Sequence, residues 1–396
     1  MTEAPLPEAS PLLLTILTLG VAILVANLYY AQPLIASIGQ ELGITPDTAG
    51  AIVSVAQVGY GTGLFLVVPL ADLVENKRLV LLLMALTVLC LVALAASSSV
   101  AAFFAASFLM GITTSGAQVL LPFAAFMVPE ARRVRTVGTI MAGILTGIML
   151  ARPVSLFIAG SFGWRAVFWT SAVMVGAIAL LLARMMPRYR PSVGMHYGRI
   201  IASMVSLPPR MPALCWRSAY AALMFGAFNM FWTAAPLMLA DRFGLSPQAI
   251  GLFALAGAGG ALAAPIAGRI AHRELVVTAG AMVLLALCFL GTGWAVAATA
   301  LVPLAVATVL LDASVQSNQV VSRRTVFATV PSLRGRVNAL YMTATFIGGA
   351  IGSLLGTVTY HGGGWWGTAM AGVGLGAMML ALLAMEVRTT RTPVVQ

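Results

Sequence analysis

The chain has 396 residues, of which 60% are hydrophobic and 8% charged, whereas an average soluble domain is about 25% charged. This composition excludes a water-soluble globular protein and predicts a chain that crosses a membrane many times. The net charge of +11 does not indicate a nucleic-acid partner, because the basic residues occur in short clusters between apolar runs and not in one patch.

The chain begins with MTEAPLPEASP, a stretch that is acidic and contains no basic residue. We therefore expect the first apolar run to be a retained helix and not a cleaved signal peptide. Apolar runs of about 20 residues can span a bilayer as helices. Twelve such spans are predicted, at about residues 12–36, 48–70, 79–97, 101–127, 136–160, 165–184, 214–240, 248–268, 275–294, 298–322, 337–360 and 366–386.

A polar, proline-containing segment divides the chain into two halves of six spans each. We expect an N-terminal bundle at residues 1–183, a cytoplasmic linker at 184–213 with a short surface helix from Tyr197 to Val205, and a C-terminal bundle at 214–396. The halves also resemble each other, since Gly43, Pro46 and Gly50 recur as Gly244, Pro247 and Gly251. The predicted fold class is therefore an all-α membrane protein of two pseudo-symmetric six-helix bundles, an architecture that transporters use with a site near the midplane.

The basic residues predict the orientation of these spans. Of the 22 lysines and arginines, 19 lie in the loops after even-numbered spans or in the C-terminal tail. Only two, Arg165 and Arg242, follow odd-numbered spans, and Arg152 lies inside a span. Positively charged loops stay on the cytoplasmic side. Both termini are therefore expected in the cytoplasm, which would place a bacterial protein of this kind in the inner membrane.

The tenth span carries an acidic residue near its centre. Asp312 lies about half-way along the stretch from Ala297 to Val321, where an ionisable group costs about 2.5–3.5 kcal/mol on insertion scales. Gln316 and Gln319 follow at spacings that place all three side chains on one helical face. Such a stripe cannot face lipid, so we expect it to face the protein interior or a watery pathway.

The fifth span carries the only basic residue that falls inside the predicted membrane core, Arg152. One interpretation is that its side chain extends to the outer interface and keeps its charge in water. The other is that it faces a central cavity, where it would contact an anion or a carboxylate. The sequence leaves both open.

Three motifs point to one family. The run NLYYAQPL at residues 27–34 is similar to a signature of twelve-span bacterial drug and metabolite exporters. The segment VPLADLVENKR at residues 68–78 resembles a loop between spans 2 and 3, although Val68 and Glu75 replace its glycines, and Gly143, Gly147 and Pro153 resemble an antiporter motif. On these motifs the chain resembles the major facilitator superfamily over essentially its whole length.

This resemblance implies roles for particular residues. Ser107 stands where many proton-coupled exporters of the family carry arginine, so Asp312 and Arg152 become the candidates for proton coupling. Spans 1, 4, 7 and 10 line the cavity in the family, and the substrate-binding candidates on them are Asn27, Tyr30, Gln32, Gln118, Asn229, Trp232, Gln316 and Gln319. The candidates for conformational gating are Asp72, Lys77, Arg78, Arg132, Arg334 and Arg336.

The predicted function is export of a small organic solute, drug-like or a metabolite, by alternating access with proton antiport. An uptake transporter of the same fold is the main alternative, and a channel or a non-transporting membrane protein is a further one. The sequence contains no phosphate-binding GxxxxGK[ST] loop and no HExxH or GxSxG motif, so we expect neither an ATP motor nor an enzyme. We expect a monomer with no cofactor and no metal, whose partners are the solute, protons and lipid.

Overall fold

The computed structural model describes residues 9–191, 196–329 and 333–391. Among these residues every regular element is a helix, which confirms the predicted all-α fold class. The chain divides into two compact units, one formed by Met1–Ile44 and Val55–Val205 and the other by Thr45–Ser54 and Ser206–Gln396. The predicted boundaries at residues 183 and 214 stay a prediction.

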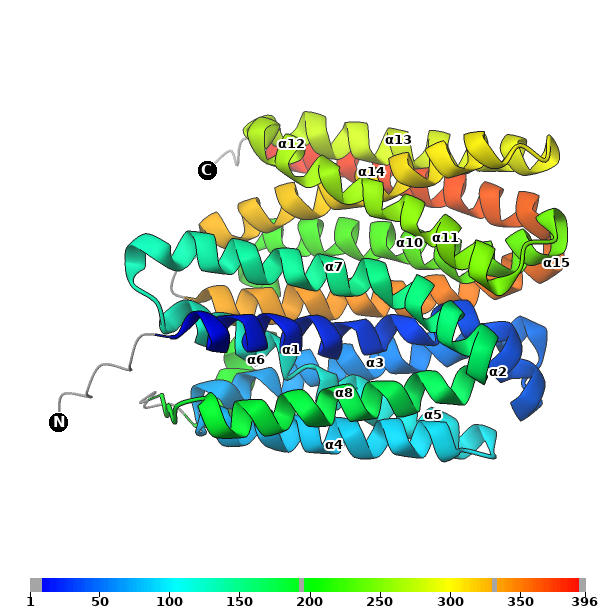
Figure 1. The fold of residues 1–396 in the computed structure, drawn as a ribbon. Helices are drawn as coiled ribbons and strands as arrows, with labels where there is room; N and C mark the ends of the chain where they lie inside the picture. The colour runs from blue at the N-terminus through cyan, green and yellow to red at the C-terminus, as the bar shows by residue number, and fades with distance from the viewer. Residues whose placement is uncertain (1–8, 192–195, 330–332, 392–396) are drawn as a thin grey trace. The chain divides into compact units, whose positions relative to one another are not determined.

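The first unit contains most of the first nine α-helices. These nine helices are α1 (Pro11–Tyr30), α2 (Ile35–Leu42), α3 (Ala51–Leu66), α4 (Asn76–Ala96), α5 (Val100–Thr114), α6 (Ala117–Phe126), α7 (Glu130–Phe162), α8 (Trp164–Met185) and α9 (Tyr197–Val205), and the unit also holds the short 3-10 turns η1 (Gln32–Leu34) and η3 (Val68–Asp72). The 3-10 turn η2 (Pro46–Thr48) and the first four residues of α3 belong to the second unit. Helix α1 packs along α7, and α4 packs along α8 (Figure 1). Helix α9 confirms the predicted helix at residues 197–205.

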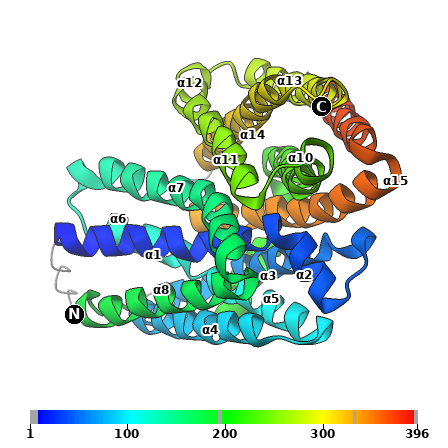
Figure 2. The same cartoon turned by 45° about the vertical axis from the view of Figure 1, so that its right-hand side comes forward.

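The second unit contains the remaining helices. They are α10 (Pro212–Phe243), α11 (Pro247–Ala258), α12 (Ala263–Ile270), α13 (Glu274–Ala297), α14 (Leu301–Thr329) and α15 (Arg334–Arg391), with η4 (Pro208–Arg210) and η5 (Gly259–Leu262). Figure 2 shows α15 running beside α10 and then turning back along α13. The turn is at Gly364, whose backbone φ of 59° interrupts the helix in a region that favours glycine.

The helices of the described residues account for the predicted spans. Ten helical stretches are long and apolar enough to cross a membrane. One of them, Arg334–Thr389, holds two spans because it is interrupted at Gly364, and α11 with η5 and α12 forms a further apolar stretch. The count is therefore consistent with the twelve spans expected from hydropathy.

Glycines allow some of these helices to touch backbone to backbone. A Cβ added at Gly352 of α15 would lie 1.9 Å from the carbonyl oxygen of Gly226 in α10, and one at Gly111 of α5 would lie 2.1 Å from that of Ala56 in α3. No side chain fits at these distances. Small residues thus set the separation of helices inside each unit, as they do in other membrane bundles.

Candidate functional site

The acid predicted at the centre of the tenth span lies on α14, inside the second unit. The side chain of Asp312 is buried, with 7% of its surface exposed, and its Oδ1 accepts a hydrogen bond of 3.1 Å from Nε1 of Trp232 on α10. The structure therefore brings together two residues that were predicted separately, one for proton coupling and one for solute binding. An indole N–H can only donate, so it can hold the carboxyl oxygen whether the acid is ionised or protonated.

Two glycines shape the space around this acid. A Cβ added at Gly257 of α11 would lie 2.5 Å from Oδ2 of Asp312 and 2.5 Å from Cζ2 of Trp232, and one at Gly260 of η5 would lie 2.4 Å from Cβ of Asp312. The acid can occupy its position only because these residues have no side chain. Neither glycine was predicted as a site residue, although their closeness in sequence was a visible signal.

The other polar candidates of the second unit make local contacts. Asn229 is fully buried and its Nδ2 donates a 2.9 Å hydrogen bond to the carbonyl oxygen of Phe225, one turn earlier in α10. Gln319 accepts a 3.3 Å hydrogen bond from Nη2 of Arg323 through Oε1. Gln316 lies one turn after Asp312 on α14 and is partly exposed. All three amides stay solute-binding candidates, and Asn229 and Gln319 use part of their hydrogen-bonding capacity inside the unit.

The buried arginine lies in the first unit. Arg152 of α7 has 4% of its surface exposed, and its Nε donates a 3.0 Å hydrogen bond to Oε1 of Gln32 in η1. Its guanidinium carbon lies 5.4 Å from the centre of the Tyr29 ring, within the range of a cation–π contact. The structure therefore contradicts the interpretation in which the Arg152 side chain extends to an exposed position. The side chain lies against α1 and η1 instead.

The remaining candidates of the first unit are bonded to neighbouring helices. Asn27 is 1% exposed, its Nδ2 donates to the carbonyl oxygen of Ile23 at 2.9 Å, and its Oδ1 accepts from Oγ of Ser171 on α8 at 2.6 Å. Gln118 donates through Nε2 to the hydroxyl of Tyr60 at 3.0 Å. Tyr30 is buried beside them on α1. Tyr60 and Ser171 were not predicted, since single hydroxyl groups in apolar runs give no sequence signal.

The gating candidates lie at helix ends. Asp72 ends η3 and is exposed, Lys77 is half-buried near the start of α4, and Arg132 is exposed near the start of α7. Another carboxylate of this loop, that of Glu75, lies 3.1 Å from Nε of Arg78 and 3.8 Å from Nε of Arg188. In the sequence, Glu75 was visible only as a replacement for glycine.

The two gating candidates of the second unit lie at the start of α15. Arg334 is exposed and its Nε donates to the carbonyl oxygen of Phe327 at 3.3 Å. Arg336 is half-buried two residues later. Nothing in these local contacts tests a gating role, which stays a prediction.

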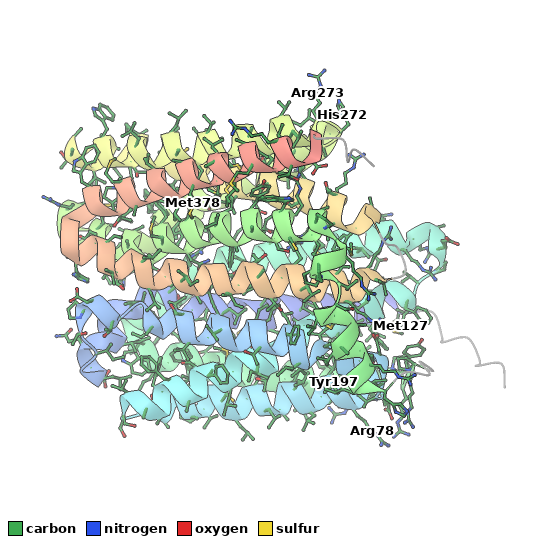
Figure 3. The ribbon with its side chains drawn as sticks, turned by 180° about the vertical axis from the view of Figure 1, so that it is seen from behind. Arg78, Met127, Tyr197, His272, Arg273 and Met378 are labelled. Atoms are coloured by element: carbon green, nitrogen blue, oxygen red, sulfur yellow. The ribbon has the colours of Figure 1, made fainter. Side chains whose placement is uncertain are left out.

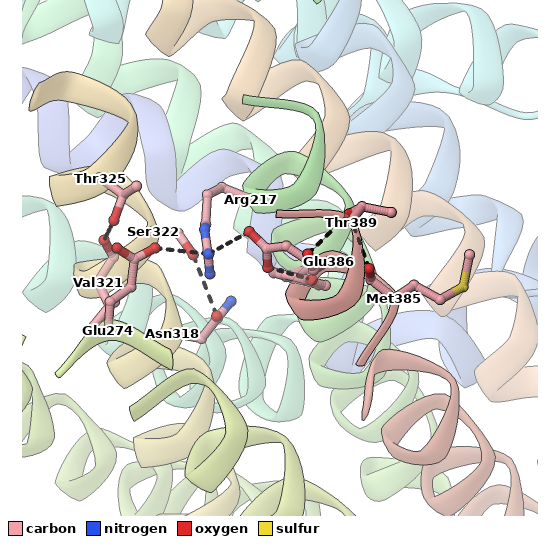
Figure 4. A network of polar contacts seen from close by, with 10 residues as sticks. Arg217, Glu274, Asn318, Val321, Ser322, Thr325, Met385, Glu386 and Thr389 are labelled. Atoms are coloured by element: carbon pink, nitrogen blue, oxygen red, sulfur yellow. Dashed lines mark hydrogen bonds and ion pairs between the residues drawn. The ribbon is translucent and has the colours of Figure 1, made fainter. Parts of the chain in front are cut away.

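A charged network in the second unit was missed entirely. Arg217 of α10 is 3% exposed, and its Nη2 lies 2.8 Å from Oε1 of Glu274 and 2.8 Å from Oε1 of Glu386, on α13 and α15 (Figure 4). The hydroxyl of Tyr220 donates to Oε2 of Glu386 at 2.8 Å. From the sequence, Arg217 was assigned to a loop together with the other arginines between spans 6 and 7. That assignment was wrong, because α10 begins at Pro212 and carries Arg217 into the interior.

Among the described residues, no group of three or more His, Cys, Asp or Glu side chains could hold a metal ion.

The family model that matches the chain is that of the Major Facilitator Superfamily, over residues 17–320 and 221–395. Among the relatives, an uncharacterized transporter, YgaY, of Escherichia coli O157:H7 is 35% identical over 371 residues, which are 93% of this chain and 94% of YgaY.

Two other proteins show how far the similarity extends. A chloramphenicol resistance protein of Streptomyces lividans is 25% identical over 282 residues, 69% of this chain and 71% of its own. The crystal structure of a D-xylose-proton symporter superposes with a TM-score of 0.74 at 15% identity, covering 92% of this chain and 96% of the symporter. At that identity the superposition shows a shared fold only.

Proposed function

The chain belongs to the Major Facilitator Superfamily, and from this membership we propose that it exports a small organic solute, drug-like or a metabolite, in exchange for protons. It is a multi-pass membrane transporter and not an enzyme. Transporters of this family bind small molecules and lie in a lipid bilayer. The direction, the coupling ion and the solute class are the parts that we propose.

The observation that carries the proposal is the setting of Asp312. A carboxyl group buried in a spanning helix is costly as an anion, so its retention there favours a functional role. The hydrogen bond from Trp232 keeps one carboxyl oxygen in place while the other oxygen lies against the glycine surface of α11. Proton binding and release at Asp312 can therefore occur without loss of its position, as a proton carrier requires.

By the family resemblance, the proposed solute-binding residues are the polar candidates of spans 1, 4, 7 and 10, and Arg152 is a second charged candidate. Alternating access exposes the site to each side of the membrane in turn, and the gating candidates around Asp72 and Arg334 stabilise one of the two states. Export is supported by the NLYYAQPL run at residues 27–34 and by the similarity to a chloramphenicol resistance protein. We place the protein in the bacterial inner membrane as a monomer with both termini in the cytoplasm.

The test is Asp312→Asn in proteoliposomes that hold the purified transporter, with a candidate drug or metabolite inside or outside and an imposed pH gradient. We expect proton-driven flux to be lost while exchange of solute between the two sides persists. Asp241→Asn is the matched control, because it makes the same chemical change at an exposed acid on α10. Undiminished proton-driven flux in Asp312→Asn would remove this acid from the mechanism.

The direction needs a separate measurement. Inside-out membrane vesicles with an acidic lumen should accumulate the solute if the protein is an exporter. Loss of preloaded solute from the same vesicles, driven by the same gradient, would instead identify a proton-coupled uptake transporter.

A further inference from the structure

An apolar groove runs along the outside of the second unit, between α13 and the last part of α15. Its volume is about 690 Å³, and it is lined by one face of α13 from Leu275 to Leu287 together with Leu383 and Val387 of α15. The side chains on this face are open, since Val276 is 67% and Leu287 is 59% exposed. Both helices are long and apolar enough to span a membrane, so the groove faces hydrocarbon.

The length of the groove matches one leaflet. From Leu275 to Leu287, helix α13 rises about 18 Å, at about 1.5 Å for each step from one residue to the next. Half of a hydrocarbon core of about 30 Å is roughly 15 Å. The groove therefore begins at one end of the unit and ends near the middle of the membrane, as the acyl chain of a lipid does.

The end of the groove nearest the membrane surface is basic. Arg273 immediately precedes α13, Arg269 lies at the end of α12, and Arg388 directly follows the groove residue Val387, and all three are exposed. Figure 3 shows Arg273 and its neighbour His272 projecting from this end of the second unit. A phosphate that lay above the acyl chain would meet these guanidinium groups.

The two acids beside the groove, Glu274 and Glu386, are held inside the unit by Arg217. Glu274 precedes the groove residue Leu275, and Glu386 precedes Val387, yet both carboxylates turn inward to the same Nη2 of Arg217, at 2.8 Å each (Figure 4). The side-chain exposure of Glu386 is only 8% and that of Glu274 is 30%. Arg217 thus holds the negative charges inside the bundle, while the positive charges next to them point outward.

From this arrangement we propose that the groove is a binding site for an anionic phospholipid. One acyl chain lies along α13 between Leu275 and Leu287, and the phosphate lies against Arg273 and Arg269. The buried Arg217 network makes the site selective, because it keeps Glu274 and Glu386 away from the phosphate. The site is independent of solute and proton binding at Asp312.

The first test separates the acyl-chain contact from helix stability. Gly280 lies in the groove, and a Cβ there would meet nothing within 4 Å, so the side chain of Gly280→Leu starts in open space and extends into the groove. Gly291 of the same helix has equally free space but lies beyond the groove, so Gly291→Leu is the matched control. The purified full-length protein is titrated with dioleoyl phosphatidylglycerol and with dioleoyl phosphatidylcholine and measured by native mass spectrometry. Gly280→Leu should weaken binding of both lipids, and Gly291→Leu should bind as the unmodified protein does.

The second test addresses the charge. The unmodified protein should bind phosphatidylglycerol more tightly than phosphatidylcholine, and Arg273→Gln should weaken phosphatidylglycerol binding roughly fivefold, the factor expected for one arginine near an anionic lipid surface. Arg273→Gln and Arg269→Gln together should weaken it further, with phosphatidylcholine unaffected. The control is Arg324→Gln, an exposed arginine on α14 away from the groove lining.

Three results would overturn the proposal. One is equal affinity of the unmodified protein for the two lipids. Another is the same effect of Arg273→Gln and Arg324→Gln on phosphatidylglycerol binding. The third is a dimer in the mass spectra that Gly280→Leu dissociates, because the groove would then be an interface between two copies of the chain.

Discussion

Replacement of Arg217 by methionine should destabilise the second unit more than any change of an exposed arginine. The substitution keeps an apolar chain of similar length in α10 but removes the guanidinium group that lies 2.8 Å from both the buried Glu386 and Glu274. Removal of one partner from a buried ion pair costs about 3–5 kcal/mol. Since the Glu274 side chain is 30% exposed and water solvates part of its charge, we take the lower value.

A loss of about 3 kcal/mol corresponds to a fall of roughly 6–12 °C in the unfolding temperature of a domain of about 150–250 residues. The assay is thermal unfolding of the purified protein in detergent, followed by the loss of monodisperse protein after heating. Arg210→Met is the control, because Arg210 is an exposed residue of η4 in the same unit. Arg210→Met should change the unfolding temperature only slightly.

A compensating variant tests the cause of the loss. If the destabilisation arises from unpaired carboxylates, Arg217→Met combined with Glu274→Gln and Glu386→Gln should regain most of the lost temperature, because no charge is left buried. The hydroxyl of Tyr220 can still donate to an amide oxygen at position 386. A triple variant that melts as low as Arg217→Met would refute this reasoning, and so would an Arg217→Met protein that melts with Arg210→Met.

Two further predictions concern the polar centres of the two units. Gly257→Ala places a methyl group 2.5 Å from both Oδ2 of Asp312 and the Trp232 ring, so the hydrogen bond between Asp312 and Trp232 should break. The loss of such a bond to a charged group is worth about 1.5–3 kcal/mol, so proton-driven flux should fall roughly ten- to hundredfold. The control is Gly268→Ala, which should keep normal flux because no atom lies within 4 Å of the added Cβ. Gln32→Leu removes the acceptor of the hydrogen bond from Nε of the buried Arg152, which should cost about 2 kcal/mol and lower the unfolding temperature by roughly 4–8 °C. Gln40→Leu, at an exposed position of α2, should leave the unfolding temperature unchanged. Equal unfolding temperatures of the two variants would contradict the role of Gln32.

The spans could be predicted from sequence because lipid imposes a simple rule on composition. The run expected at 165–184 is α8, Trp164–Met185, and that expected at 79–97 is α4, Asn76–Ala96. The run expected at 136–160 is α7, which begins at Glu130, because hydropathy detects the apolar part of a helix and misses a charged first turn that continues into water.

The charged interior of the second unit could not be predicted in this way. Arg217 lies 169 residues from Glu386 in the sequence, so no local pattern connects them. Each of the three charged residues of the network also lies near the end of an apolar run, where a charge normally marks the membrane surface. Only the packing of α10, α13 and α15 shows that these charges face one another. Removing Arg217 from the 19 loop charges leaves 18 against two, so the argument for the orientation of the spans is unchanged.

The two candidate charged residues share a structural setting that composition did not reveal. In each unit the charge lies where a 3-10 turn interrupts a spanning stretch: Gln32 of η1 accepts from Arg152, and Gly260 of η5 lies against Asp312. Such interruptions free backbone groups, which a membrane tolerates only where protein or a water-filled cavity covers them. Pro33 and the glycines before Leu262 account for the interruptions, since proline lacks an amide hydrogen and glycine weakens a helix. Because broken helices are where membrane transporters place ion and solute sites, the backbone supports the same two positions that the side chains indicate.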